Sequence, residues 1–213
     1  MTVKVLYYLE SNDLQYHILG AFSVAQTRKV MPDVEIVQLA GSKTEPLIGV
    51  DRVHRRASDW PNRSGHIAQF HAGEPGGALC LDVDTLVFED VSDVFNEPFD
   101  LAVSNRHFTD GFLPNTPYNS GVVFSRSETF WKTNEVAYVE AGKPMHDKVF
   151  CSTVNGSQFR VLKLDGAQYN YIPQTPECNF TGRKIVHFTG SRKAWMKDYC
   201  LWKSLKGALH ALG

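Results

Sequence analysis

The chain has 213 residues, of which 43% are hydrophobic, and this composition excludes disordered and fibrous proteins. Its 22 Lys and Arg residues nearly balance its 23 Asp and Glu residues, which disfavours a dedicated nucleic-acid wrapper but leaves a local basic patch open. No apolar run reaches the roughly 18–20 residues that a membrane span requires. We therefore expect one domain over residues 1–213, with no membrane span.

The N-terminus runs directly into a strand-like segment, without the basic head, apolar middle and small-residue cleavage site of a signal peptide. The four cysteines are far apart and form no CxxC pair, so reduced thiols are expected rather than disulfides. Together these features predict a cytoplasmic protein.

In chain order, Val3–Leu9 predicts a buried strand, and Leu14–Val30 predicts a helix with its apolar residues on one face. Asn12 or Asp13 caps this helix, and Pro32 stops it. The later expected segments are a strand at Val34–Leu39, a loop at 41–59, a helix from Asn62 to about His71, strands at Ala78–Leu81, Leu101–Ser104 and Gly121–Phe124, helices at Ser127–Ala141 and Asp147–Val154, strands at Arg160–Leu164 and Lys184–Phe188, and a helix at Ala194–Leu212.

This alternation of strands and helices predicts an α/β fold with a mostly parallel central sheet flanked by helices. Repeats, low-complexity tracts and linker-like stretches are absent from the sequence. A single domain is therefore the expected organisation.

The most informative segment joins a predicted strand to two carboxylates. The apolar run Leu79–Leu81 is followed by Asp82, Val83 and Asp84. The carboxyl ends of parallel strands form the ligand crevice of an α/β sheet. Residues two apart in an extended segment share a face, so both aspartates can bind one hard cation. A solvated Asp-x-Asp turn without a ligand is the alternative interpretation.

A strand followed by two aspartates is also typical of aspartyl-phosphate phosphatases, in which the first Asp is the nucleophile and the second an acid/base. Their motif is DxDx[TV], whereas here Thr85 directly follows Asp84 and Leu86 takes the fifth position. About eighty residues precede Asp82, although that motif normally opens its domain. A phosphatase is therefore kept as an alternative function.

Several segments together carry a family resemblance, and they are Leu81–Val87 with Asp90–Phe95, Tyr118–Val123, Met145–Phe150, Tyr169–Pro173 and Val186–Trp195. In this order they resemble the motifs of retaining glycosyltransferases of family 8, the glycogenin-like and bacterial galactosyltransferase-like group. The resemblance covers nearly the whole chain. It implies a GT-A fold, a divalent ion that is usually Mn²⁺, and a UDP-sugar donor.

The sequence departs from the family pattern at two places. Ala194 stands where the family has Pro, and His146-Asp147-Lys148 stands where it has Asp-Gln-Asp. The polar roles of that second segment therefore cannot be transferred unchanged. Much of the family continues into a longer C-terminal acceptor or membrane-anchoring region, which leaves the acceptor undetermined.

The resemblance implies that Asp82, Asp84 and His187 hold the metal. An imidazole nitrogen is acceptable to Mn²⁺ and suits Mg²⁺, the alternative ion, less well. A hydrogen-bonded core histidine is the other interpretation of His187.

A second set of residues is expected to contact the nucleotide sugar. Lys193 is expected to pair with the β-phosphate and Gly190 to let backbone N–H groups approach it; Arg63 and His66 are candidates for the phosphate or the sugar. The remaining candidates are Asn119 and Ser120 for sugar hydroxyls, Asp82 and Val83 beside the ribose, and Tyr7, Tyr8 and Leu9 for uracil. For the lysine, the arginine and His66 the alternative is a solvated surface position, and for the tyrosines it is the core.

Asp147 falls where the family places a Gln beside the anomeric carbon. A carboxylate there can stabilise an oxocarbenium-like state or attack it covalently, as in retaining glycosidases. A helix N-cap is the competing interpretation. With Asn119, Asp147 is the predicted catalytic residue.

The sequence thus predicts a metal-dependent glycosyltransferase that moves a hexose from UDP-glucose or UDP-galactose to a hydroxyl acceptor with retention. The acceptor is a glycan or a protein hydroxyl, with a hydroxylated DNA base less favoured. A non-catalytic nucleotide-sugar binding module is a second alternative. The only feature that favours a polyanion is a basic group formed by Arg28, Lys29, Arg52, Arg55, Arg56 and Arg63.

Overall fold

The computed structural model describes residues 3–56, 62–74, 76–106, 116–142, 146–156 and 158–211, with side chains up to residue 204. The strands are β1 (Lys4–Tyr8), β2 (Glu35–Gly41), β3 (Arg52–Arg56), β4 (Ala78–Leu81), β5 (Thr85–Val87), β6 (Leu101–Asn105), β7 (Tyr118–Ser125), β8 (Val161–Leu164) and β9 (Ile185–His187). The helices are α1 (Leu14–Val30), α2 (Arg63–Gly73), α3 (Glu128–Glu140), α4 (His146–Asn155), α5 (Gly166–Tyr169) and α6 (Lys193–Ala211), with 3₁₀ turns η1 (Ser92–Asn96) and η2 (Gly190–Arg192).

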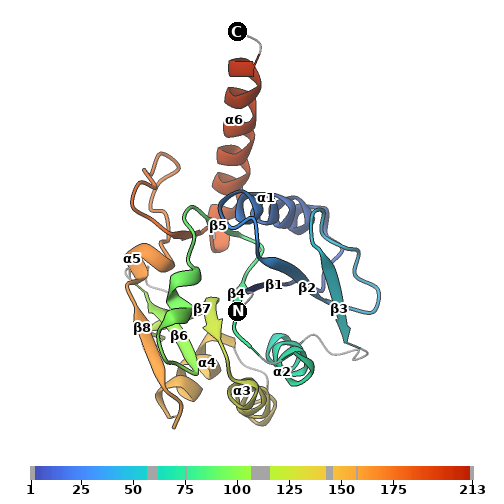
Figure 1. The fold of residues 1–213 in the computed structure, drawn as a ribbon, viewed down its shortest axis with the longest axis vertical. Helices are drawn as coiled ribbons and strands as arrows, with labels where there is room; N and C mark the ends of the chain where they lie inside the picture. The colour runs from blue at the N-terminus through green and yellow to red at the C-terminus, as the bar shows by residue number, and fades with distance from the viewer. Residues whose placement is uncertain are drawn as a thin grey trace.

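Seven strands form the central sheet in the order β3-β2-β1-β4-β7-β6-β8 (Figure 1). The pairs β3-β2, β2-β1, β1-β4 and β6-β8 are parallel, whereas β7 runs antiparallel to both of its neighbours. The predicted mostly parallel sheet is therefore confirmed. Because Tyr7 pairs with Leu81, the chain leaving β1 and the acidic turn leaving β4 emerge side by side at the carboxyl edge.

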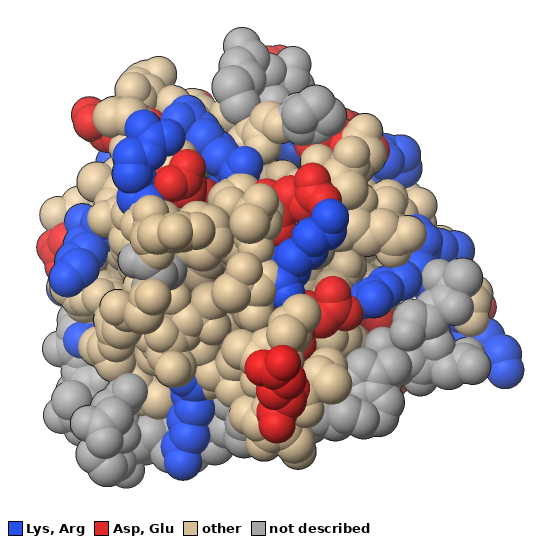
Figure 2. Space-filling model, turned by 90° about the horizontal axis from the view of Figure 1, so that it is seen from below, with Lys and Arg blue, Asp and Glu red and all other residues tan. Residues whose placement is uncertain are grey.

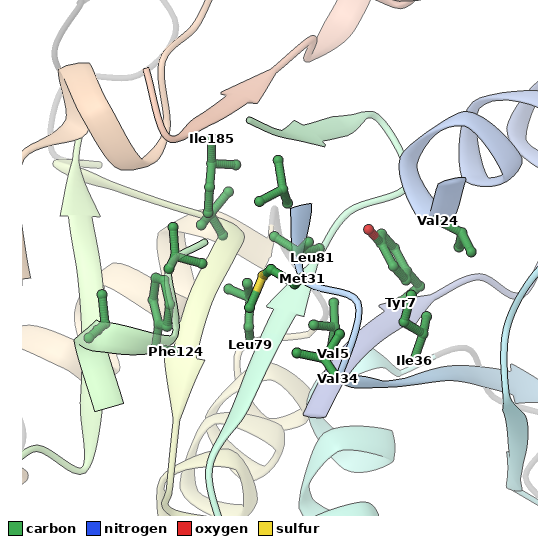
Figure 3. Packing of buried hydrophobic residues seen from close by; sticks show 14 of the residues in the cluster. Val5, Tyr7, Val24, Met31, Val34, Ile36, Leu79, Leu81, Phe124 and Ile185 are labelled. Carbon is green, nitrogen blue, oxygen red and sulfur yellow. The ribbon is translucent and has the colours of Figure 1, made fainter. Parts of the chain in front are cut away.

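Alternation along the strands builds one core on each face of the sheet. Val5 and Leu79 face α1, whereas Leu6 and Cys80 face the layer of α2, α3 and α4. Figure 3 shows the first of these cores, with Tyr7 directed toward α1. The two cores fix β1 and β4, and therefore the position of the acidic turn between them.

Local capping explains where two helices begin. The Asp13 side chain accepts a hydrogen bond from Gln15 N, and that of Asn62 accepts one from Gly65 N. Both predicted caps are therefore confirmed.

The prediction of a loop over 41–59 was wrong for Arg52–Arg56, which forms β3 (residues 57–59 lie outside the described ranges). In the described part of the chain this strand pairs with β2 only, as an edge strand does. Its arginines interrupt the run of apolar residues by which a buried strand is predicted, so the sequence pattern did not indicate it. Arg52 forms ion pairs with Glu35 and Glu74, which accounts for a charged residue at the sheet edge.

A second, two-stranded sheet joins distant parts of the chain. β5 follows the acidic turn directly and pairs antiparallel with β9, over a core shared with α1 and α6. Figure 1 shows α6 leaving this sheet and extending away from the body of the molecule. In the described part of the chain, every helix is too short or too polar to cross a membrane.

Candidate metal centre and adjoining pocket

The turn after β4 presents the two predicted carboxylates. Asp82 N donates to Gly121 O on β7 (2.9 Å), which continues the β4-β7 ladder by one bond. Thr85 then closes the turn, because its N–H and its hydroxyl both donate to the Asp82 carbonyl (3.2 and 2.7 Å). Both side chains are thereby held at the edge of the sheet, Asp84 buried and Asp82 half-exposed.

His187 reaches this turn through the second sheet, in which it pairs with Thr85. Its Nε2 lies 3.3 Å from Asp84 Oδ1 and 3.7 Å from Asp82 Oδ2. Its Nδ1 faces Asn170 Oδ1 at 3.1 Å, and because an amide oxygen only accepts, Nδ1 carries a proton. A second partner of this kind typically fixes a metal-ligating histidine with its other nitrogen toward the ion.

Two cations border the carboxylates. Lys193 Nζ lies 2.7 Å from Asp84 Oδ2, and Arg63 Nη1 lies 2.5 Å from Asp82 Oδ1. Within the described residues, the Nε and Nη2 atoms of Arg63 are buried without a hydrogen-bond partner. The guanidinium thus places a positive charge against Asp82, with part of its hydrogen-bonding capacity unused.

The charges shift the ionisation of the buried groups. Burial alone would raise the pKa of Asp84, but His187 and Lys193 outweigh it and hold that pKa well below its usual range. Burial alone would lower the pKa of His187, whereas the Asp84 and Asp82 carboxylates raise it. Asp84 thus stands ready as an anionic oxygen ligand.

Three observations fit this cluster to a divalent cation. Asp82, Asp84 and His187 each direct one donor atom to a common point, with these atoms within 4.8 Å of one another. Oxygen ligands with one imidazole suit Mn²⁺. A Cβ at Gly121 would lie 2.2 Å from His187 Cε1 and 2.7 Å from Asp82 Oδ2, so only glycine leaves room for this arrangement.

A pocket of about 250 Å³ adjoins the cluster. Of the predicted residues it brings together Tyr8, Leu9, Asp82, Val83, Asp84 and Lys193. Glu10, Ser11 and Tyr16 also line it, and the sequence analysis did not select them. Glu10 and Ser11 could have been predicted from their position, because they follow β1 at the carboxyl edge of the sheet.

Three predicted residues lie elsewhere. The Tyr7 side chain belongs to the core (Figure 3), and its hydroxyl contacts those of Thr27 and Ser23 (2.8 and 2.9 Å), which is the alternative named for this tyrosine. His66 is buried behind Tyr8, with its ring edge-on to that ring at 5.6 Å, and its Nε2 lies 3.1 Å from Oε1 of the pocket residue Glu10. Gly190 lies in η2 before Lys193, and its φ of 66° is the left-handed conformation that favours glycine.

Asp147, in the first turn of α4, forms a second polar cluster with β7. Its Oδ1 accepts from Ser120 N and Ser120 Oγ (3.0 and 2.7 Å). Its Oδ2 accepts from Arg106 Nη2 and Asn119 Nδ2 (2.6 and 3.2 Å). Burial alone would raise the pKa of Asp147, but the Ser120 hydrogen bonds and the Arg106 charge hold it below its usual range.

Asn119 connects the two clusters. Its amide nitrogen contacts Asp147, while its Oδ1 accepts from Gly121 N (2.8 Å), which lies beside Asp82 and His187. Two functional residues were not among the predicted site residues. Arg106 pairs with Asp147, and Asn170 orients His187. Arg106 stands in no motif of the sequence, whereas Asn170 lies in the Tyr169–Pro173 segment that carries part of the family resemblance, where it was given no role of its own.

No family model matches the sequence, and no curated protein matches it. The structure is similar to a glycosyltransferase involved in the glycosylation of the major capsid of PBCV-1, with TM-score 0.68 and 15% identity over 95% of this chain and 100% of that one. It is also similar to the galactosyltransferase LgtC in complex with donor and acceptor sugar analogs (TM-score 0.62, 15% identity, 96% and 95% of the chains). GlyE of Streptococcus pneumoniae TIGR4 gives TM-score 0.60 and 12% identity over 98% of this chain and 64% of that one. These similarities confirm the predicted GT-A type of fold.

Proposed function

We propose that this chain is a metal-dependent glycosyltransferase of the family 8 type. It transfers a hexose from UDP-glucose or UDP-galactose to a hydroxyl acceptor with retention of the anomeric configuration. The observation that carries the proposal is the Asp82–Asp84–His187 cluster, placed beside Lys193 and a pocket at the carboxyl edge of this fold.

The first task of such an enzyme is to stabilise a departing diphosphate. Asp82, Asp84 and His187 would hold Mn²⁺, which supplies positive charge where the leaving group becomes negative. Lys193 and the Arg63 guanidinium add protein charge at the same edge. These groups are already in place before reaction, which is what makes electrostatic stabilisation effective.

The pocket supports binding of the nucleoside. Tyr8, Leu9 and Val83 line it with apolar surface, and Glu10 and Ser11 line it with polar groups. A flat pyrimidine ring requires such apolar walls and a few convergent polar groups. Asn119 and Ser120 lie next to Asp147, where their short polar side chains are suited to hydrogen-bond sugar hydroxyls.

Of the three roles predicted for Asp147, that of charge stabiliser has the best support from its contacts. A carboxylate has about four lone-pair sites, and four donors fill them. Covalent attack through Oδ2 would require the ion pair with Arg106 to break. The cap role is less supported, because these donors come from β7 and Arg106 rather than from α4.

The acceptor is a glycan or a protein hydroxyl. The basic group that would favour a polyanion is largely engaged within the protein: the arginines pair with Asp51, Glu35, Glu74, Glu135 and Asp82, and Arg55 donates to backbone carbonyls. On the face that Figure 2 shows, positive and negative side chains alternate. A hydroxylated base in DNA is therefore the least favoured acceptor.

A panel of UDP- and GDP-sugars with Mn²⁺ or Mg²⁺ tests the proposal, scored by released nucleotide and by the anomeric NMR signal of the product. We expect UDP release from UDP-glucose or UDP-galactose with Mn²⁺, and its loss in Asp84→Ala. Phosphate release from small esters without a nucleotide sugar would instead identify the phosphatase. Binding of UDP with Mn²⁺ but no turnover of any donor would identify the binding module.

A further inference from the structure

A chain of buried and half-buried polar side chains leads from α4 to the Asp147 carboxylate and passes through His146. The ring of His146 lies between Ser64 on α2 and Ser120 on β7, with Nε2 3.0 Å from Ser64 Oγ and Nδ1 3.2 Å from Ser120 Oγ. His146 takes no part in the metal cluster or the pocket described above.

The direction of each hydrogen bond in this chain follows from its far end. The Val149 carbonyl only accepts, so the Thr153 hydroxyl donates to it (2.9 Å). Thr153 Oγ1 must then accept from Asn134 Nδ2 (3.0 Å), which turns Asn134 Oδ1 toward Ser64. Asn134 Oδ1 accepts the Ser64 proton (2.7 Å), and Ser64 and Asn134 are both fully buried.

The Ser64 hydroxyl therefore donates its only hydrogen bond to Asn134, and toward His146 it can act only as an acceptor. This assigns a proton to His146 Nε2. Burial and the charge of Arg63 lower the pKa of His146 to about 4, although Asp147 and Asp82 act in the opposite direction. At neutral pH the ring is uncharged, so Nδ1 is bare and faces the Ser120 hydroxyl.

The Ser120 proton thus has two acceptors. One is Asp147 Oδ1 at 2.7 Å and the other is His146 Nδ1 at 3.2 Å. When the hydroxyl turns toward His146, one lone pair of Asp147 Oδ1 becomes free, while Ser120 N, Arg106 and Asn119 still hold the carboxylate. The turn is a rotation about a C–O bond and transfers no proton between groups.

We propose that His146 is a positioning residue for Asp147: its bare Nδ1 takes up the Ser120 hydroxyl so that a hydroxyl of the donor sugar can bind Asp147 Oδ1. This rests on the proposed function, because it requires a sugar in the site. Without an acceptor at Nδ1, the incoming hydroxyl competes with Ser120 for a carboxylate whose lone pairs are filled.

A matched pair of variants isolates Nδ1. An Asn amide oxygen can occupy the position of Nδ1, whereas a Gln side chain reaches the position of Nε2 and leaves Nδ1 without a replacement. We expect His146→Asn to keep kcat/KM for UDP-glucose or UDP-galactose hydrolysis within a few-fold of the wild type. His146→Gln should lower it about ten- to hundredfold, as is typical for residues that orient an active-site group. Affinity for UDP with Mn²⁺ should stay unchanged in both variants.

Two further measurements keep the proposal separate from simple loss of stability. In a Ser120→Ala background the Asn and Gln variants should become equal, because the competing hydroxyl is gone. In ¹⁵N-histidine-labelled protein without substrate, the two-bond ¹H–¹⁵N spectrum should show His146, assigned by its loss in His146→Asn, as the neutral Nε2–H tautomer at pH 7.5.

An Nδ1–H tautomer, an imidazolium, or equal activity of the Asn and Gln variants would overturn the positioning role while leaving the proposed function intact. Failure of the wild type to bind UDP with Mn²⁺, or to turn over any donor, would overturn the proposed function and the sugar-binding role with it. The two failures are therefore distinguishable.

Discussion

Gly121→Ala should dismantle the metal centre while leaving the fold in place. The added Cβ would lie 2.2 Å from His187 Cε1, 2.7 Å from Asp82 Oδ2 and 2.8 Å from Asn119 Oδ1. Carbon–carbon contacts are favourable only at about 3.5–4.0 Å, so the imidazole must move by more than an ångström. The same Cβ would also displace the Asn119 amide oxygen, which lies on the same side of Gly121 as Asp82.

The size of the effect follows from this displacement. A misplacement of about 1 Å in a catalytic arrangement can lower activity about a hundredfold, and overpacking typically costs about 1–3 kcal/mol of unfolding free energy. A domain of this size should stay folded after such a loss. We therefore expect Mn²⁺-dependent UDP binding to fall at least about a hundredfold, with the melting temperature lowered by several degrees.

Calorimetric titration of UDP in the presence of Mn²⁺, paired with thermal unfolding, measures both effects. Gly73→Ala is the matched control, because a Cβ at this last residue of α2 meets no atom within 4 Å. The control should bind like the wild type and be equally or slightly more stable. Wild-type affinity in Gly121→Ala would refute the assignment of the cluster as the metal centre.

Two further changes test other parts of the site, and a third tests the stability of the fold. Asp147→Asn should keep UDP affinity but lower turnover by orders of magnitude, since an amide nitrogen must face one of four donors; unchanged rates would exclude Asp147 from the mechanism. Asn170→Ala should weaken Mn²⁺ binding about ten- to hundredfold in a titration, because His187 loses the partner of Nδ1; an Asn170→Asp variant, which still accepts that proton, should bind more tightly than Asn170→Ala. Burial lowers the pKa of His71 to about 4, below its unfolded value near 6.5, so its stabilising contribution is complete above pH 6.5 and is lost as the pH falls toward 4. Unfolding free energies of His71→Leu should therefore depend less on pH than those of the wild type in that window, and parallel curves would contradict the buried neutral state.

The acidic turn and the helix caps around the site could be predicted from the sequence, because each depends on residues that are neighbours in the chain. The apolar β4 run followed by Asp82 and Asp84 placed two carboxylates at a sheet edge without any knowledge of distant contacts. The caps at Asp13 and Asn62 were equally local. His187 required the family resemblance, since nothing near it in sequence announces that β9 pairs with β5.

The remaining contacts are tertiary and had no local signal. Arg106 meets Asp147 because β6 and α4 lie on either side of β7, and Asn170 meets His187 because the chain after α5 pairs with β9. The Tyr7 side chain lies in the core rather than in the pocket for a related reason. Residues along a strand alternate between faces, and the register places Tyr7 toward α1 while its neighbour Tyr8 lines the pocket.

The charges around the acidic turn give a reason for metal and donor to bind together. Asp82 and Asp84 carry two negative charges, which Arg63 and Lys193 already offset within 2.7 Å. A divalent cation alone would therefore add two uncompensated positive charges, and the two negative charges of a UDP-sugar diphosphate alone would add the opposite excess. Only the two together restore neutrality in a partly buried site, where unbalanced charge is expensive. In the proposed reaction the departure of the sugar would leave one further negative charge on the diphosphate, and Lys193 and the Arg63 guanidinium are the protein cations closest to the acidic turn that could stabilise it.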